Sequence, residues 1–124
     1  MGAAVNAFSV DLEDWMHAET LAPVVRGRWD AWPSRVEVGV ERLLGLLEEH
    51  GARATFFCLG WLAERRPGLV RRIAALGHEV ASHGYAHVPI WRLSPREFRQ
   101  DVRRSKRLLE DICGQEVIGY RAPT

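Results

Sequence analysis

The most informative stretch of the chain is VASHGYAH, which runs from Val80 to His87. A short apolar run ends at Ser82, and two histidines then follow four residues apart. Two imidazoles at this spacing can reach one cation, and a serine at the end of a strand can steady the first ring. Two surface histidines without a metal would give the same pattern, so the interpretation depends on what lies elsewhere in the chain.

Polar residues also follow the first and last apolar runs. Residues 4–10 form a strand-like run that ends in the acidic cluster Asp11-Leu12-Glu13-Asp14. Residues 117–120 form another such run, which is followed by Arg121-Ala122-Pro123. Carboxylates, imidazoles and a guanidinium therefore all come where predicted strands end.

The segments between these runs alternate between helix and strand. Residues 53–59 and 78–82 are predicted strands, and a continuous apolar run such as the first is typical of a parallel strand buried on both faces. Apolar residues at helical spacing predict a helix from residue 36, capped by Ser34, up to His50-Gly51, and two more over residues 62–66 and 67–76. The capping box Ser94-Pro95-Arg96-Glu97 opens a fourth predicted helix, which ends near Gly114. Residues 15–33 are expected to form a functional loop. The order β-α-β-α-β-α-β predicts an α/β fold with a parallel sheet.

In parallel sheets of this class, ligands bind outside the carboxyl ends of the strands. The side chains collected at that edge are Asp11, Asp14, His83, His87 and Arg121. Five polar residues at one edge of the sheet are more than exposure to solvent alone would place there. They predict a functional site.

The charge and cysteine content of the chain bear on which kinds of partner it binds. The 124 residues carry 17 basic and 16 acidic side chains, a net charge of +1, so nothing indicates nucleic acid or an anionic membrane as a partner. Cys58 and Cys113 lack metal-site spacing and are expected to be small buried side chains. No signal peptide or membrane span is apparent, which predicts a cytoplasmic protein.

These motifs resemble those of the polysaccharide deacetylase (NodB-homology) family, carbohydrate esterase family 4. FSVDLED over residues 8–14 resembles the first family motif, SHGYAH over 82–87 the second and RAP over 121–123 the third. Residues 55–57 and 77–80 resemble the second and third family strands, so the similarity covers nearly the whole chain. The form Asp-x-Glu-Asp-Trp resembles deacetylases of bacterial exopolysaccharide loci.

The resemblance implies a fold and a set of roles. The fold would be the N-terminal half of a distorted (β/α) barrel, with parallel strands and helices outside. Asp11 would be the general base, Asp14, His83 and His87 would bind a divalent metal, and Arg121 would orient the base. The metal would be zinc, with cobalt, nickel or manganese as alternatives. The substrate would be an acetylated oligo- or polysaccharide that loses N- or O-acetyl groups.

The sequence departs from the family pattern at two positions near the site. Three acidic residues stand where the family usually has adjacent aspartates. On an extended segment Asp11 and Glu13 point the same way and Asp14 the other, so Glu13 competes with Asp14 as the metal carboxylate. Gly84 follows His83 where the family often has serine or threonine.

The third departure concerns the later family motifs. These motifs supply a histidine general acid and the strands that close the barrel, and they have no counterpart in residues 1–124. We therefore expect a deacetylase domain truncated on its C-terminal side. A catalytically silent metal- or glycan-binding module is the alternative, and hydrolysis of another amide is a third hypothesis.

The remaining expectations concern the substrate and the sheet edge. Trp15 and Trp91 flank the site and are predicted to stack on sugar rings, while His17 is a candidate acid in the rim loop. Pro123 completes the predicted substrate-binding set. The open edge of the last strand, residues 117–120, predicts self-association.

Overall fold

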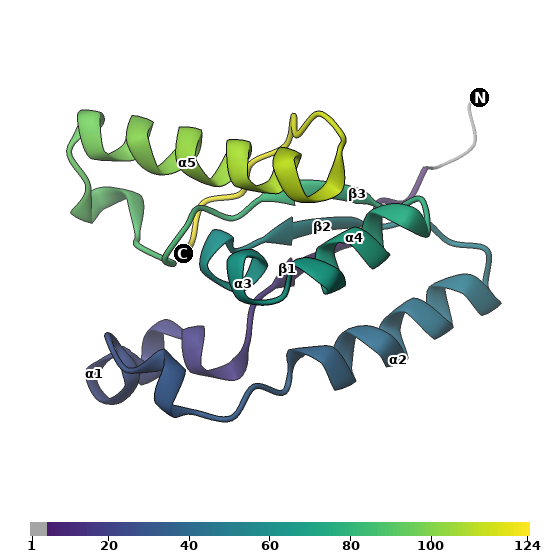
Figure 1. The fold of residues 1–124 in the computed structure, drawn as a ribbon, viewed down its shortest axis with the longest axis horizontal. Helices are drawn as coiled ribbons and strands as arrows, with labels where there is room; N and C mark the ends of the chain where they lie inside the picture. Colours follow the sequence, from purple (N-terminus) through teal and green to yellow (C-terminus); the bar gives the residue numbers. More distant parts are fainter. Residues whose placement is uncertain (1–4) are drawn as a thin grey trace.

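The computed structural model describes residues 5–124. Its centre is a parallel sheet of three strands in the order β1 (Ser9–Leu12), β2 (Thr55–Cys58) and β3 (Glu79–Ser82) (Figure 1). Each pair of strands is joined through helices, so the predicted α/β class is confirmed.

Four longer helices accompany the sheet, and they are α2 (Val36–Glu49), α3 (Gly60–Arg65), α4 (Pro67–Ala75) and α5 (Pro95–Cys113). The predicted loop over residues 15–33 is a chain of short turns, namely η1 (Trp15–His17), η2 (Glu19–Leu21), α1 (Ala22–Val25) and η3 (Trp29–Ala31). A last 3-10 turn, η4 (Ile90–Arg92), precedes α5. No helix among residues 5–124 is both long enough and apolar enough to cross a membrane.

The N-terminus of α5 is set by a local capping box, whereas the N-terminus of α2 is set by a contact with a distant residue. At α5 the predicted capping box is confirmed, because the Glu97 amide donates to the Ser94 hydroxyl and the Ser94 amide donates to the Glu97 carboxylate. The predicted cap of α2 is wrong. Arg35 is its N-cap residue, and Ser34 donates its hydroxyl to Asp14 instead.

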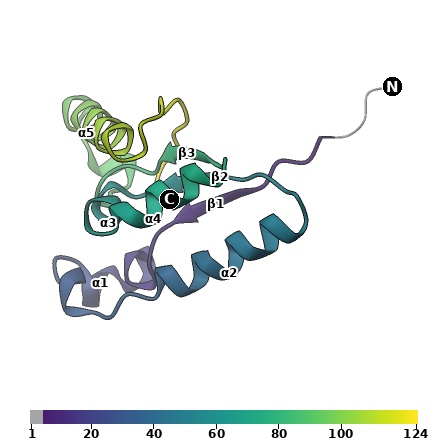
Figure 2. The ribbon, with the colours of Figure 1, turned by 45° about the vertical axis from the view of Figure 1, so that its right-hand side comes forward.

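The apolar core lies between the helices and one face of the sheet. Buried side chains of α2, α4 and α5 meet those of Leu12, Phe56 and Val80, and Figure 2 shows α2 and α4 running alongside the strands. Burial alternates along β1, where Leu12 is buried and Asp11 exposed. Asp11 therefore lies on the face turned away from the core.

Two predicted strands differ from the observed ones. β1 is shifted toward the acidic cluster, so Asp11 lies within the strand, while residue 4 lies outside the described residues. The predicted strand over residues 117–120 is reduced to one parallel bridge between Ser82 and Tyr120. Its first residue, Val117, binds α5 instead, because its amide donates to Glu110 and its carbonyl accepts from Lys106.

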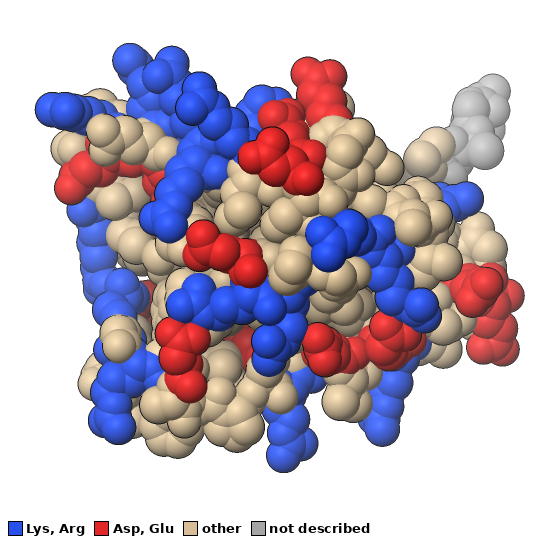
Figure 3. Space-filling model, viewed as in Figure 1, with Lys and Arg blue, Asp and Glu red and all other residues tan. Residues whose placement is uncertain are grey.

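The charged surface is mixed. On the face shown in Figure 3, basic and acidic side chains are interspersed, with basic side chains concentrated over α5. Cys58 is fully buried and Cys113 half-buried, and both are free thiols. Burial raises the pKa of the Cys58 thiol, which makes it an inert part of the core.

Gly60 at the start of α3 gives a first test of the fold. A Cβ at this position would lie 2.7 Å from Cδ2 and 3.2 Å from Cα of Tyr85, whereas one at Gly68 in α4 would meet nothing within 4 Å. We expect Gly60→Ala to lower the free energy of unfolding by about 1–3 kcal/mol. Gly68→Ala, the matched control, should leave it unchanged or raise it by up to about 1 kcal/mol. Urea denaturation checks both, and equal stabilities would contradict the observed approach of Tyr85.

Candidate metal and catalytic site

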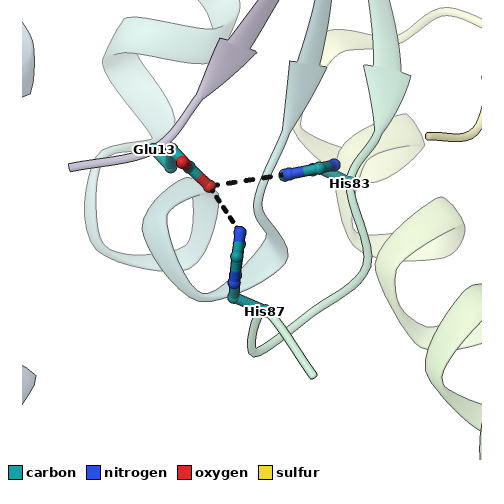
Figure 4. Close-up of side chains that lie close together, drawn as sticks. All are labelled: Glu13, His83 and His87. Carbon is teal, nitrogen blue, oxygen red and sulfur yellow. Dashed lines mark ion pairs between the residues drawn. The ribbon is translucent and has the colours of Figure 1, made fainter. Parts of the chain in front are cut away.

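Glu13, His83 and His87 converge at the carboxyl edge of the sheet (Figure 4). Oε2 of Glu13 lies 2.9 Å from Nε2 of His87 and 3.5 Å from Nε2 of His83. One ligand atom from each of the three residues lies within 4.8 Å of the others. Both histidine side chains are buried and the glutamate is partly buried, so the cluster faces a space with restricted access to water.

Strand register places two of these residues. Leu12, Cys58 and Ser82 lie in line across the sheet, so Glu13 and His83 are the first residues beyond β1 and β3. The His83 amide extends the pairing by donating to the Cys58 carbonyl at 3.0 Å. His87 has a positive φ of 51°, a left-handed conformation that costs a non-glycine residue roughly 1–2 kcal/mol. Local strain of this kind at a polar cluster is typical of functional sites.

The hydrogen bond at Nδ1 of His83 fixes the tautomer of its neutral ring. Nδ1 donates to the Arg121 carbonyl at 2.8 Å, which in a neutral ring leaves the lone pair of Nε2 directed at Glu13. Burial lowers the pKa of His83, but the contacts with Glu13 and the Arg121 carbonyl outweigh it, so the pKa is raised overall. Burial raises the pKa of Glu13, yet its contacts with His83 and His87 hold the pKa at about 2.

The cluster fits a divalent cation. Within the described residues, Oε2 of Glu13 is buried without a hydrogen-bond partner, and it faces Nε2 of both His83 and His87. Buried polar atoms without partners cost free energy, and an ionised carboxylate facing imidazole lone pairs is unfavourable unless a proton or cation lies between them. Two imidazoles and one carboxylate form a ligand set of catalytic zinc sites, which leaves coordination positions open.

Asp11 and Arg121 lie beside this cluster. Nη1 of Arg121 lies 2.6 Å from Oδ1 of Asp11, and its Nη2 donates to the Ser9 hydroxyl at 2.7 Å. The guanidinium also stacks on Phe57, 4.1 Å from the ring centroid. The second Asp11 oxygen, Oδ2, lies 3.9 Å from Nε2 of His83. The ion pair fixes Oδ1 and leaves Oδ2 facing His83.

Asp14 does not join the histidines, contrary to the expectation that it is the metal carboxylate. Its carboxylate is 4% exposed and accepts hydrogen bonds from the amides of Arg35 and Val36 at the start of α2. It also accepts from the Ser34 hydroxyl. A carboxylate that binds free amides at a helix N-terminus is well satisfied there. The structure thus brings Glu13 to the histidines and uses Asp14 to hold α2.

His17 is also placed differently from the expected rim position. It is 2% exposed, its Nδ1 accepts from the Asp14 amide at 2.7 Å, and its ring lies edge-on to Trp29 and Trp61. Burial lowers the pKa of His17 to about 4, so the ring is neutral near pH 7. A neutral histidine enclosed by tryptophans is not accessible to substrate.

The other residues predicted to contact substrate differ in their exposure. Trp15 and Trp91 are exposed, by 39% and 72%, although the Trp15 indole also donates to the Pro33 carbonyl. Pro123 is fully buried, and its Cγ lies 3.6 Å from where a Cβ on Gly84 would be. The ring packs behind the histidine loop, and a contact between Pro123 and substrate stays a prediction.

A cavity of about 370 Å³ opens over the cluster, lined by Asp11, Glu13, His83 and His87 together with Ala18, Glu19, Thr20, Ala122 and Thr124. Glu19 and Thr20 are absent from the predicted site. Glu19 pairs with Arg26 at 2.7 Å and Arg92 at 3.1 Å, which fixes η2 against the cavity. The length of the loop signals a functional segment, but nothing in its sequence singles out these two residues.

Comparison with known proteins gives consistent matches. Residues 19–124 match the sequence profile of the polysaccharide deacetylase family. A chitooligosaccharide deacetylase of Sinorhizobium fredii is 35% identical over 105 residues, which are 84% of this chain and 48% of that protein. A peptidoglycan-N-acetylglucosamine deacetylase of Bacillus cereus is 34% identical over 82 residues, 66% of this chain and 30% of that protein. The chain thus spans less than half the length of these relatives.

Solved structures agree with the sequence matches. A Mycobacterium smegmatis structure assigned to the polysaccharide deacetylases superposes with a TM-score of 0.77 at 35% identity, covering 94% of this chain and 42% of that one. A carbohydrate esterase family 4 pseudoenzyme from Bacillus anthracis superposes with a TM-score of 0.65 at 29% identity, covering 67% and 30%. The matched profile, the sequence relatives and the shared fold together show that this chain belongs to the polysaccharide deacetylase family.

Proposed function

We propose that this domain carries out metal-dependent removal of acetyl groups from an acetylated oligo- or polysaccharide. The observation that carries the proposal is the convergence of Glu13, His83 and His87 beside an Asp11 carboxylate that Arg121 orients. The metal ligands in this proposal are Glu13, His83 and His87, and Asp11 is the general base. Zinc suits the two nitrogens and one oxygen, and cobalt, nickel or manganese are alternatives.

The chemistry divides between the cation and the chain. A divalent cation at this site supplies Lewis acidity, which polarises the acetyl carbonyl and makes water more acidic. Asp11 accepts the proton of the attacking water through Oδ2, the oxygen that Arg121 leaves free. Arg121 fixes the direction of the Asp11 carboxylate through its contact with Oδ1. His83 is oriented through its Nδ1 hydrogen bond, a partnership typical of metal-binding histidines.

The substrate class rests on the relatives and on the exposed aromatic rings. The relatives named above are deacetylases of chitooligosaccharide and of peptidoglycan, so N-acetyl groups on amino sugars are the proposed target. Trp15 and Trp91 are the exposed rings proposed to stack on sugars. The assignment to an exopolysaccharide locus stays a prediction from the acidic motif.

A catalytically silent binding module is the second candidate, and one observation favours it. His17 is buried, and none of the five histidines among residues 5–124 is left at the cavity to protonate the leaving amine. The fold neighbour from Bacillus anthracis is itself described as a pseudoenzyme. Acetate release from acetylated chitooligosaccharide with added zinc or cobalt separates the two candidates.

Metal binding is tested by comparing the two neighbouring acids. We expect Glu13→Ala or His87→Ala to abolish stoichiometric zinc binding, because each removes one ligand. Asp14→Asn is the matched control and should keep zinc binding, because asparagine can still accept from the amides of α2. Isothermal titration calorimetry measures both. Loss of binding in Asp14→Asn with retention in Glu13→Ala would return the carboxylate role to Asp14.

The role of Asp11 is tested by a substitution that keeps its shape. Asp11→Asn should leave zinc affinity close to that of the unsubstituted protein and slow deacetylation by about 10²–10⁴-fold, because an amide cannot take up the proton of water. Calorimetry and an acetate-release assay provide the two measurements. A large loss of zinc affinity would show instead that Asp11 is a ligand.

We also propose that the chain self-associates through the edge formed by residues 117–120. Only Tyr120 bridges to β3, and Ile118 is 78% exposed beside that edge. Ile118→Lys should shift the sedimentation profile toward the monomer. Val24→Lys is the control, because Val24 is 63% exposed on α1. A monomer at high concentration without any substitution would refute this proposal.

A further inference from the structure

The loop between the two histidines is held by one side chain of its own and by its backbone. The Tyr85 hydroxyl donates to Glu64 of α3 at 2.6 Å, and the Tyr85 ring lies under the Arg104 guanidinium of α5. The first residue after His83 is Gly84, which has a positive φ of 75° and no side chain. The geometry of His87 relative to His83 therefore also depends on contacts that the loop backbone makes with other elements. Those contacts come from α3 on one side and α5 on the other.

The α3 side binds the carbonyl groups of the loop. The Gly60 amide donates to the Gly84 carbonyl, and the Trp61 amide donates to the Tyr85 carbonyl, both at 2.8 Å. These are free amides at the start of a helix, and they satisfy the acceptors of the loop. The amide groups of the loop need partners elsewhere.

The α5 side supplies those partners through Asp101. Both carboxylate oxygens of Asp101 accept from the Tyr85 amide, at 3.2 and 3.3 Å. Oδ2 also lies 2.9 Å from where a Cβ on Gly84 would be, so the carboxylate occupies the space of a side chain at that position. A residue larger than glycine at position 84 would therefore require the Asp101 carboxylate to move.

A second contact from α5 acts on the same loop. The Gly84 amide donates to the Ser82 hydroxyl at 3.2 Å, and the Ser82 and Ser105 hydroxyls lie 2.8 Å apart. Ser105 donates to the Asp101 carbonyl at 2.9 Å, which leaves Ser82 as the donor to Ser105. The hydrogen bonds therefore run in one direction from the loop to α5, and both serines are fully buried.

From these contacts we propose that Asp101 is a positioning residue that holds the His83–His87 loop so that both imidazoles face Glu13. The inference rests on the proposed metal-binding function, which it deepens by assigning the support of the ligands to α5. Without Asp101 the Tyr85 amide loses its acceptor, and one of the restraints on the position of His87 relative to His83 is lost. Ser105 assists through Ser82.

The test compares three variants of the full chain. Asp101→Ala should weaken zinc binding about 10–100-fold, the loss typical when a group that supports a metal ligand is removed. Asp101→Asn should retain most of the affinity, because its amide oxygen still accepts from Tyr85. Asp111→Ala is the matched control, since Asp111 lies on the same helix and is exposed. Calorimetry gives the affinities, and the visible spectrum of the cobalt-loaded protein reports the coordination geometry.

A readout without metal separates this inference from the proposed function. Amide hydrogen exchange at Tyr85 in the metal-free protein should be faster in Asp101→Ala than in the control, with little change in the melting temperature. Zinc affinity and cobalt spectrum equal to the control would overturn the role of Asp101. Failure of the unsubstituted protein to bind zinc would refute the proposed function instead. Should Asp101→Ala not fold, Ser105→Ala is expected to weaken zinc binding and alter the cobalt spectrum, and unchanged values would overturn the inference.

Discussion

The parallel register of the three strands is the constraint on which the site depends. Leu12, Cys58 and Ser82 are paired across the sheet, so the residues that follow β1 and β3 leave it at the same level. Glu13 and His83 are brought together for this reason, although they are seventy positions apart in the chain. A slip of one residue in either pairing would turn the alternating side chains to the opposite face and separate the carboxylate from the imidazoles.

Three acids within four positions have three different partners. Asp11 lies in β1, turned away from the core, and pairs with Arg121. Glu13 lies just beyond the strand and meets the two imidazoles. Asp14 turns to the helix layer and binds the first amides of α2. The acidic cluster thus connects the face of the sheet that carries Asp11 and Arg121, the candidate metal site and the helix that completes the core.

The histidine loop shows how the helix layer influences the site without contacting a ligand. Amides of α3 bind the carbonyls of the loop, and Asp101 and Ser105 of α5 bind its amides directly or through Ser82. Each of these helices also packs in the common core through buried residues such as Leu62 and Leu109. The stability of the core is therefore coupled to the position of the proposed metal ligands.

Local signals in the sequence were enough to predict the α/β class, the order of strands and helices as far as α5, and the Ser94 capping box. The polar residues after the apolar runs predicted which end of the sheet would carry a site. Only the tertiary structure decided the division of labour among Asp11, Glu13 and Asp14, since the bend after β1 depends on α2. It also decided the burial of His17 and Pro123 and the short pairing at Tyr120, because packing against tryptophans, Gly84 and α5 leaves no trace in local sequence.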